Sequence, residues 1–101
     1  MDKNKITVSF HNVDTSDALK EVIISKLERL IKMHGNYLTR VDYTLSMENP
    51  KESLNPEQFK SSLHLHGKMK KEFHFDVTDK NPRSTVTSVV NKAINALKKD
   101  Y

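Results

Sequence analysis

The sequence predicts an α+β domain in which two helices pack on one face of a four-stranded sheet. Four segments alternate apolar and polar residues, as strands with one buried face do. Two longer segments repeat apolar residues every three or four positions, which is typical of amphipathic helices. The resulting order is β-α-β-β-β-α, and a two-layer sandwich buries all of these apolar faces together. We expect solvent on the other face of the sheet, as an antiparallel arrangement allows.

The first strand and the first helix occupy the amino-terminal part of the chain. A strand is expected over residues 6 to 11, with Ile6, Val8 and Phe10 turned inward. Thr15 or Ser16 can cap a helix that begins near residue 16, and Gly35 can end it. Apolar residues at helical spacing form its inward stripe: Leu19, Ile23, Leu27, Leu30 and Ile31.

Three strands and a second helix follow. Alternation predicts strands over residues 41 to 48, 59 to 66 and 72 to 78, with a loop at 49 to 58 that contains two prolines. A short basic connection at 68 to 70 joins the last two strands into a hairpin. Asn81 and Pro82 suit the cap and the first position of a helix over residues 82 to 99. Its inward stripe consists of Val86, Val89, Val90, Ala93, Ile94 and Leu97.

Length and composition restrict the class of protein. A chain of 101 residues suits one domain, and the absence of cysteine excludes disulfides, thiolate metal sites and a cysteine nucleophile. No signal peptide is evident and no apolar run is long enough to span a membrane, so we expect a cytoplasmic protein without a membrane partner. The formal net charge of +4 gives a mild bias toward polyanionic partners.

Cationic residues lie on the outer sides of both expected helices. Lys26, Arg29 and Lys32 follow one another at intervals of three, and the second helix adds Lys92, Lys98 and Lys99. Because both helices cover the same face of the sheet, their outer sides can merge into one cationic surface. The outward sheet positions carry acidic residues instead: Asp42, Glu48, Glu72 and Asp76. Charge placement alone leaves two interpretations open, a surface for a polyanion and ordinary solvated helix faces.

Catalytic motifs are absent from the sequence. It contains no phosphate-binding loop, dinucleotide-binding glycine pattern, zinc-protease motif or nucleophile elbow. We therefore expect no enzyme, no small-molecule substrate and no cofactor. The aromatic residues Phe10, Phe59, Phe73 and Phe75 lie at inward positions, so binding of nucleic acid would use helix faces and phosphates rather than base stacking.

The expected hairpin also carries several histidines that could form a metal site together with nearby carboxylates. If the turn holds residues 68 to 70, His64 lies opposite His74 and His66 opposite Glu72. Imidazoles and carboxylates on one exposed face could bind zinc or a similar metal. Because the ligand set is incomplete, we assign no metal ligand from the sequence.

The first helix and the segment before it, NVDTSDALKEVIISKLERL, resemble the start of the ribosome hibernation-promoting factor family. This family includes the ribosome-associated inhibitor and the sigma-54 modulation proteins. The matching positions are Ser16, Ala18, Leu19, Lys26, Leu27, Arg29 and Leu30. The second helix departs from the family pattern: it opens with NPRSTVT, and Asn95 stands where a basic residue is common. The loop at 49 to 58 is longer than is usual in the family.

The resemblance implies a factor that binds the small ribosomal subunit through its ribosomal RNA. It would occupy the decoding channel, block mRNA and tRNA, and act in stationary phase or stress. We expect a short member: a single ribosome-binding domain over residues 1 to 101, without the C-terminal ribosome-dimerisation domain and monomeric off the ribosome. The expected RNA-binding residues are Lys26, Arg29, Lys32, Lys92, Lys98 and Lys99, with Lys68, Lys70, Lys71 and Arg83 as weaker candidates. The alternative is a regulatory protein-binding module, either with or without a metal on the sheet face that carries the histidines.

Overall fold

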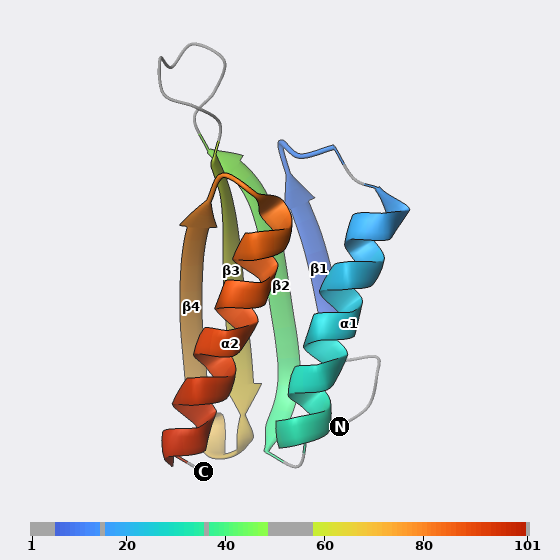
Figure 1. Cartoon of the computed structure of the whole chain (residues 1–101). Coiled ribbons are helices and arrows are strands. Elements are labelled where there is room, and N and C mark those ends of the chain that lie inside the picture. The colour runs from blue at the N-terminus through green and yellow to red at the C-terminus, as the bar shows by residue number, and fades with distance from the viewer. Residues whose placement is uncertain (1–5, 15, 36, 49–57, 101) are drawn as a thin grey trace.

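The helices and strands follow the predicted order in a computed structural model of the chain (Figure 1). The structure describes residues 6–14, 16–35, 37–48 and 58–100, apart from the side chains of Glu48, Lys99 and Asp100. The elements are β1 (Ile6–His11), α1 (Asp17–His34), β2 (Leu38–Glu48), β3 (Gln58–Gly67), a 3-10 turn η2 (Lys68–Lys70), β4 (Glu72–Asp79) and α2 (Pro82–Asp100). The predicted loop at 49 to 58 lies outside the described residues except for Gln58, which begins β3.

The sheet has the strand order β1-β2-β3-β4 and is mixed rather than wholly antiparallel. β1 pairs with β2 in parallel, because α1 carries the chain back to the end of the sheet where β1 started. The other two pairs are antiparallel. His64 lies opposite His74 and His66 opposite Glu72, so the predicted hairpin register is confirmed.

Both helices begin at the predicted caps. The Leu19 amide donates to Ser16 Oγ at 3.1 Å, and the Arg83 amide donates to Asn81 Oδ1 at 2.9 Å. Gly35 caps the end of α1 with a right-handed backbone, φ −63°. A side chain there would collide with the Ile31 carbonyl oxygen, so close approach accounts for this glycine. These caps fix where each helix starts and hence which residues face outward.

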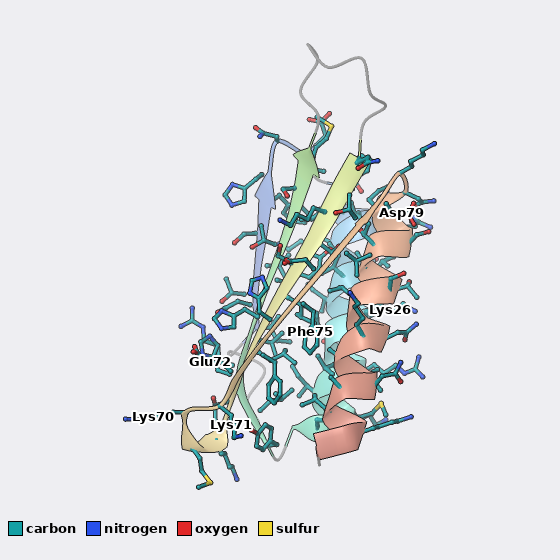
Figure 2. The ribbon with its side chains drawn as sticks, turned by 90° about the vertical axis from the view of Figure 1, so that its left-hand side faces the viewer. Lys26, Lys70, Lys71, Glu72, Phe75 and Asp79 are labelled. Carbon is teal, nitrogen blue, oxygen red and sulfur yellow. The ribbon has the colours of Figure 1, made fainter. Side chains whose placement is uncertain are left out.

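The core lies between the sheet and the two helices, which run side by side across one face of the sheet (Figure 1). Figure 2 shows Phe75 pointing from β4 toward the helices and Glu72 pointing to the opposite side. All six predicted inward residues of α2 are buried, as are four of the five on α1; Ile31 is half-buried. The predicted two-layer arrangement is therefore confirmed.

A buried chain of hydroxyl groups ties α2 to the sheet. Tyr43 Oη lies 2.6 Å from Ser61 Oγ, which donates to Thr85 Oγ1 at 2.9 Å. Thr85 Oγ1 in turn donates to the Pro82 carbonyl oxygen at 2.6 Å. Since Ser61 has one proton and gives it to Thr85, Tyr43 donates to Ser61. Burial raises the pKa of Tyr43 to about 12, so the phenol keeps its proton at neutral pH.

The variant Ser61→Ala is expected to lower the free energy of unfolding by about 1–3 kcal/mol, because the Tyr43 hydroxyl would stay buried without its acceptor. Urea denaturation measures this loss. Ser46→Ala, at a half-exposed position of β2, is the control and should change stability by no more than about 0.5 kcal/mol. A loss that small for Ser61→Ala would contradict the role of the hydroxyl chain.

Candidate nucleic-acid interface

The cationic row on α1 starts beside α2 and turns toward solvent. Lys26 is half-buried, whereas Arg29 and Lys32 are exposed. Each step of three residues rotates the direction of the side chain by about 60° around the helix. Arg29 and Lys32 therefore extend the positive charge from the junction of the two helices onto the outer face of α1.

Lys26 and Arg83 meet at an open hollow between the helices. Its lining combines residues of α1 with one residue of α2: Ala18, Glu21, Val22, Ser25, Lys26 and Arg83. A neighbouring hollow on α2 is lined by Arg83, Ser84, Thr87 and Ser88. Arg83 thus lies between two hollows that offer several hydroxyl groups and, on one side, an ammonium group. We call these two adjoining hollows the helix groove.

The chemistry of the helix groove suits phosphate. Guanidinium groups form paired hydrogen bonds with phosphate oxygens, and ammonium and hydroxyl groups add single donors. Among the described residues, Glu21 is the only carboxylate that lines either of the two hollows. An RNA backbone that lay along the groove could therefore contact Lys26 and Arg83 at once.

The remaining predicted cations of α2 fall on different sides of the helix. Lys92 Nζ donates to the Asp76 carbonyl oxygen at 3.4 Å, so Lys92 lies on the flank toward β4. Lys98 is exposed and follows Arg83 by fifteen residues, about four turns, which places it on the same side as Arg83. The side chain of Lys99 lies outside the described residues.

Arg83 is only a weaker candidate from the sequence, because helical spacing separates it from Lys92 without indicating which of the two faces α1. It precedes Lys92 by nine residues, which puts the two on opposite sides of α2. Once α1 and α2 are known to be neighbours, only one of these two sides can face Lys26. The structure brings Lys26 together with Arg83 rather than with Lys92.

The lysines of the hairpin turn lie away from the helix groove. Lys68, Lys70 and Lys71 are exposed around η2, and Figure 2 shows Lys70 and Lys71 at the tip of the hairpin, far from Lys26. Met69 and Lys70 have left-handed backbones, φ 63° and 61°, and Met69 is 94% exposed. The turn therefore presents a separate basic patch.

Charge is distributed unevenly between the two faces of the domain. The described side chains of the helices include seven basic residues and three acidic ones. The seven are Lys20, Lys26, Arg29, Lys32, Arg83, Lys92 and Lys98, and the three are Asp17, Glu21 and Glu28. The outer sheet face balances Arg40 and Lys60 against Asp42, Glu72 and Asp76, and adds four histidines. Among the described side chains, which leave out that of Glu48, carboxylates thus outnumber cations on the sheet face, in contrast to the basic helix face.

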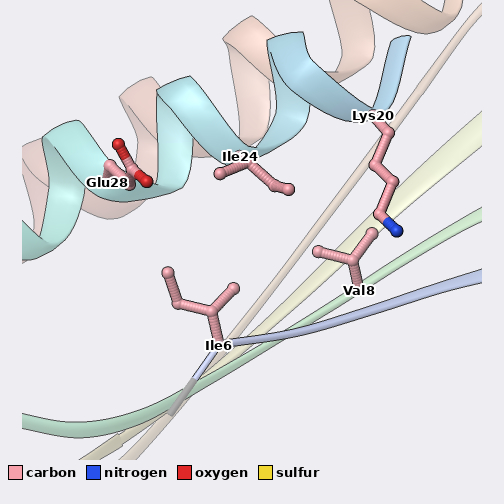
Figure 3. A pocket seen from close by; sticks show the side chains of 5 residues that line it. All are labelled: Ile6, Val8, Lys20, Ile24 and Glu28. Carbon is pink, nitrogen blue, oxygen red and sulfur yellow. The ribbon is translucent and has the colours of Figure 1, made fainter. Parts of the chain in front are cut away.

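A third hollow lies on the other flank of α1, between this helix and β1 (Figure 3). Ile6, Val8 and Ile24 form its lining, together with Lys20 and Glu28. Because the described lining is mostly aliphatic and carries one carboxylate as well as one cation, the hollow is less suited to phosphate than the helix groove.

Comparison with known proteins identifies the family. The family model described as Sigma 54 modulation protein / S30EA ribosomal protein matches residues 6–100. The chain belongs to this family. Members of the S30EA family associate with ribosomes and are not enzymes, so the predictions of the family and of a non-enzymatic protein are confirmed. No curated protein sequence gives a match.

Solved structures share the S30EA fold with this chain. A ribosomal subunit interface protein from Coxiella burnetii superposes with a TM-score of 0.73 and 17% identity, over 93% of each chain. The N-terminal domain of Thermus thermophilus Protein Y superposes with a TM-score of 0.71 and 13% identity, over 96% of this chain and 99% of that one. At these identities the likeness establishes the fold. Among the described residues, no helix is both long and apolar enough to cross a membrane.

Proposed function

We propose that this chain binds the small ribosomal subunit through ribosomal RNA, occupies the channel used by mRNA and tRNA, and thereby inhibits translation. One observation carries the proposal: Lys26 and Arg83, from two different helices, line the same open hollow. Membership of a ribosome-associated family makes RNA phosphate the natural ligand for such a groove. Inhibition would be steric and would need no catalytic group.

The placement of the aromatic residues supports recognition of the RNA backbone. Phe10, Phe59, Phe73 and Phe75 are half-buried and pack against the core. They are therefore not arranged as an exposed platform on which bases could stack. Binding through phosphates depends on the shape of the folded RNA more than on its sequence. This mode suits a site on the ribosome, where the RNA has one fixed shape.

The biological setting follows from this mode of action. A factor that occupies the decoding channel silences ribosomes reversibly, which suits hibernation in stationary phase or stress. It would act in the cytoplasm, where ribosomes are. A single ribosome-binding domain that is monomeric off the ribosome stays a prediction.

The proposal is tested by co-sedimentation with purified subunits and chemical probing of their RNA. We expect the protein to sediment with the small subunit and not with the large one. It should protect nucleotides in the decoding region and compete with mRNA and tRNA. Binding to the large subunit alone, or protection confined to the outside of the small subunit, would overturn the proposal.

Salt dependence reports the number of phosphate contacts. The variant Arg83→Gln is expected to lower the slope of log K against log salt concentration by about 0.7–0.9, the value for one lost contact. Lys20→Gln removes the same charge from the β1 side of α1 and serves as the matched control. Titration of small-subunit binding at several salt concentrations measures both slopes. Equal slopes for the two variants would show that Arg83 does not contact phosphate.

The histidine face supports the second candidate function, a regulatory protein-binding module. Imidazole rings of His64 and His74 lie 5.7 Å apart between centroids on the outer sheet face. This function predicts that replacing both histidines abolishes partner binding while charge reversal on α1 is harmless. The proposal of RNA binding predicts the opposite result, so the same two variants separate the two functions.

A further inference from the structure

Three adjacent strands bring histidines and carboxylates together on the face of the sheet opposite the helices. Asp42 on β2 lies directly across from His64 on β3. His66 follows His64 by two residues and therefore points to the same face. On the other side of β3, Glu72 on β4 lies across from His66. The register of two strand pairs thus gathers these four side chains.

Asp42, His64 and His66 come close enough to share one ion. Each offers one donor atom, and these atoms lie within 4.8 Å of one another. His66 Nε2 is 3.4 Å from Asp42 Oδ2, and the rings of His64 and His66 are 4.3 Å apart between centroids. Donors in a tetrahedral zinc site are about 3.3 Å apart, given metal–ligand distances of about 2.0–2.1 Å. Small side-chain rotations would therefore complete the site.

Neighbouring groups orient these donors as the outer shell of a metal site does. Arg40 Nε donates to Asp42 Oδ1 at 2.9 Å, which leaves Oδ2 facing His66. Glu72 Oε1 lies 3.3 Å from His66 Nδ1, on the far side of the ring from Asp42, and 3.4 Å from His64 Nε2, so it contacts both rings. A carboxylate that accepts from the second ring nitrogen fixes the ring and strengthens the histidine as a ligand. His74 is engaged differently, with Nε2 3.1 Å from Asp76 Oδ1.

We propose that Asp42, His64 and His66 bind a zinc ion, with Glu72 holding His66 in place. Two imidazoles and one carboxylate favour a borderline divalent metal such as zinc over calcium or magnesium, which prefer oxygen ligands. The side chains are half-buried, with relative exposures of 26%, 38% and 30%, so the ion would keep a position open toward solvent. A water molecule or a group from a partner would fill this fourth position.

Zinc binding at this site goes beyond the proposed function and does not depend on it. The ligands lie on the outer face of the sheet, whereas Lys26 and Arg83 lie between the helices on the other face. We therefore expect the two surfaces to respond to separate substitutions. The three-ligand site also differs from the predicted pairing of His64 with His74. Its third ligand, Asp42, comes from β2, and the local sequence does not place β2 beside the hairpin.

Isothermal titration of metal-free, untagged protein with zinc chloride at pH 7.5 tests the site. We expect one zinc ion per chain. The double variant His64→Gln/His66→Gln should bind at least about tenfold more weakly, since loss of an outer-shell partner alone costs about 10–100-fold. His11→Gln removes an exposed histidine at the end of β1 and should bind zinc as the unchanged protein does. Circular dichroism confirms that each variant is folded.

Three outcomes would overturn the zinc site: no binding by the unchanged protein, equal affinity in the double histidine variant, or loss of binding in His11→Gln. The double histidine variant should also bind small subunits within about twofold of the unchanged protein. A Lys26→Glu/Arg83→Glu variant should keep its affinity for zinc. Failure of the zinc titration would therefore leave the proposal of RNA binding standing, and failure of subunit binding would leave the zinc site standing.

Discussion

Reversing Lys26, Arg29 and Lys32 to glutamate is expected to weaken binding to the small ribosomal subunit by at least about a hundredfold. Three charge-assisted contacts at about 1 kcal/mol each correspond to that factor, before repulsion between the new carboxylates and phosphate is added. Arg29 and Lys32 are exposed, Lys26 is half-buried beside α2, and none of the three belongs to the buried core. The fold should therefore survive the change. Co-sedimentation at constant salt measures the loss.

A matched control separates the position of the charges from their number. Reversing Lys20, Arg40 and Lys60 makes the same change, because each reversal removes two charges and takes the formal net charge from +4 to −2. Lys20 lies on the β1 side of α1, and the other two lie on the sheet face. This control should keep most of its affinity. Equal losses in both triple variants would indicate nonspecific attraction and would contradict an interface on the helices.

The fold was largely predictable because periodicity reports which side of an element is buried. The alternation around Tyr43 and the helical spacing around Leu27 each identify one apolar face, and a two-layer sandwich is the arrangement that covers all of them. Pairing between strands that no short turn connects is a different matter, since local patterns carry no information on which of these strands are neighbours. The parallel pairing of β1 with β2 and the position of Asp42 beside His64 emerge only from the three-dimensional structure.

The candidate site was also predictable only in part, on α1 but not on α2. The row of Lys26, Arg29 and Lys32 could be read from the spacing on α1. The partner on α2 could not, because choosing between Arg83 and Lys92 requires the direction in which α2 faces α1. Ser61 was missed for a related reason: a polar residue at an inward strand position looks like an interruption until its partner Thr85, on another element, is known.

Replacing Leu27 by alanine is expected to have the largest effect on stability. Leu27 has no exposed surface and lies in the middle of the buried stripe of α1. Deleting buried methyl groups loses their transfer free energy and leaves a cavity, which together cost about 2–5 kcal/mol. Domains of this size are stable by only about 5–15 kcal/mol, so the loss is a large fraction of the free energy of unfolding. Chemical denaturation measures the difference.

Met33→Ala on the same helix is the control, because Met33 is 44% exposed and its truncation leaves no closed cavity. It should cost clearly less than Leu27→Ala, and equal losses would contradict the placement of the core. The Leu27 variant also bears on function. Leu27 adjoins Lys26 in the sequence, but Leu27 packs in the core whereas we propose that Lys26 contacts RNA. Below its unfolding temperature, the Leu27→Ala variant should keep its affinity for the small subunit. The triple charge reversal should lose that affinity but remain stably folded. The two variants thus separate the apolar side of α1, which holds the domain together, from the cationic side, which we propose contacts RNA.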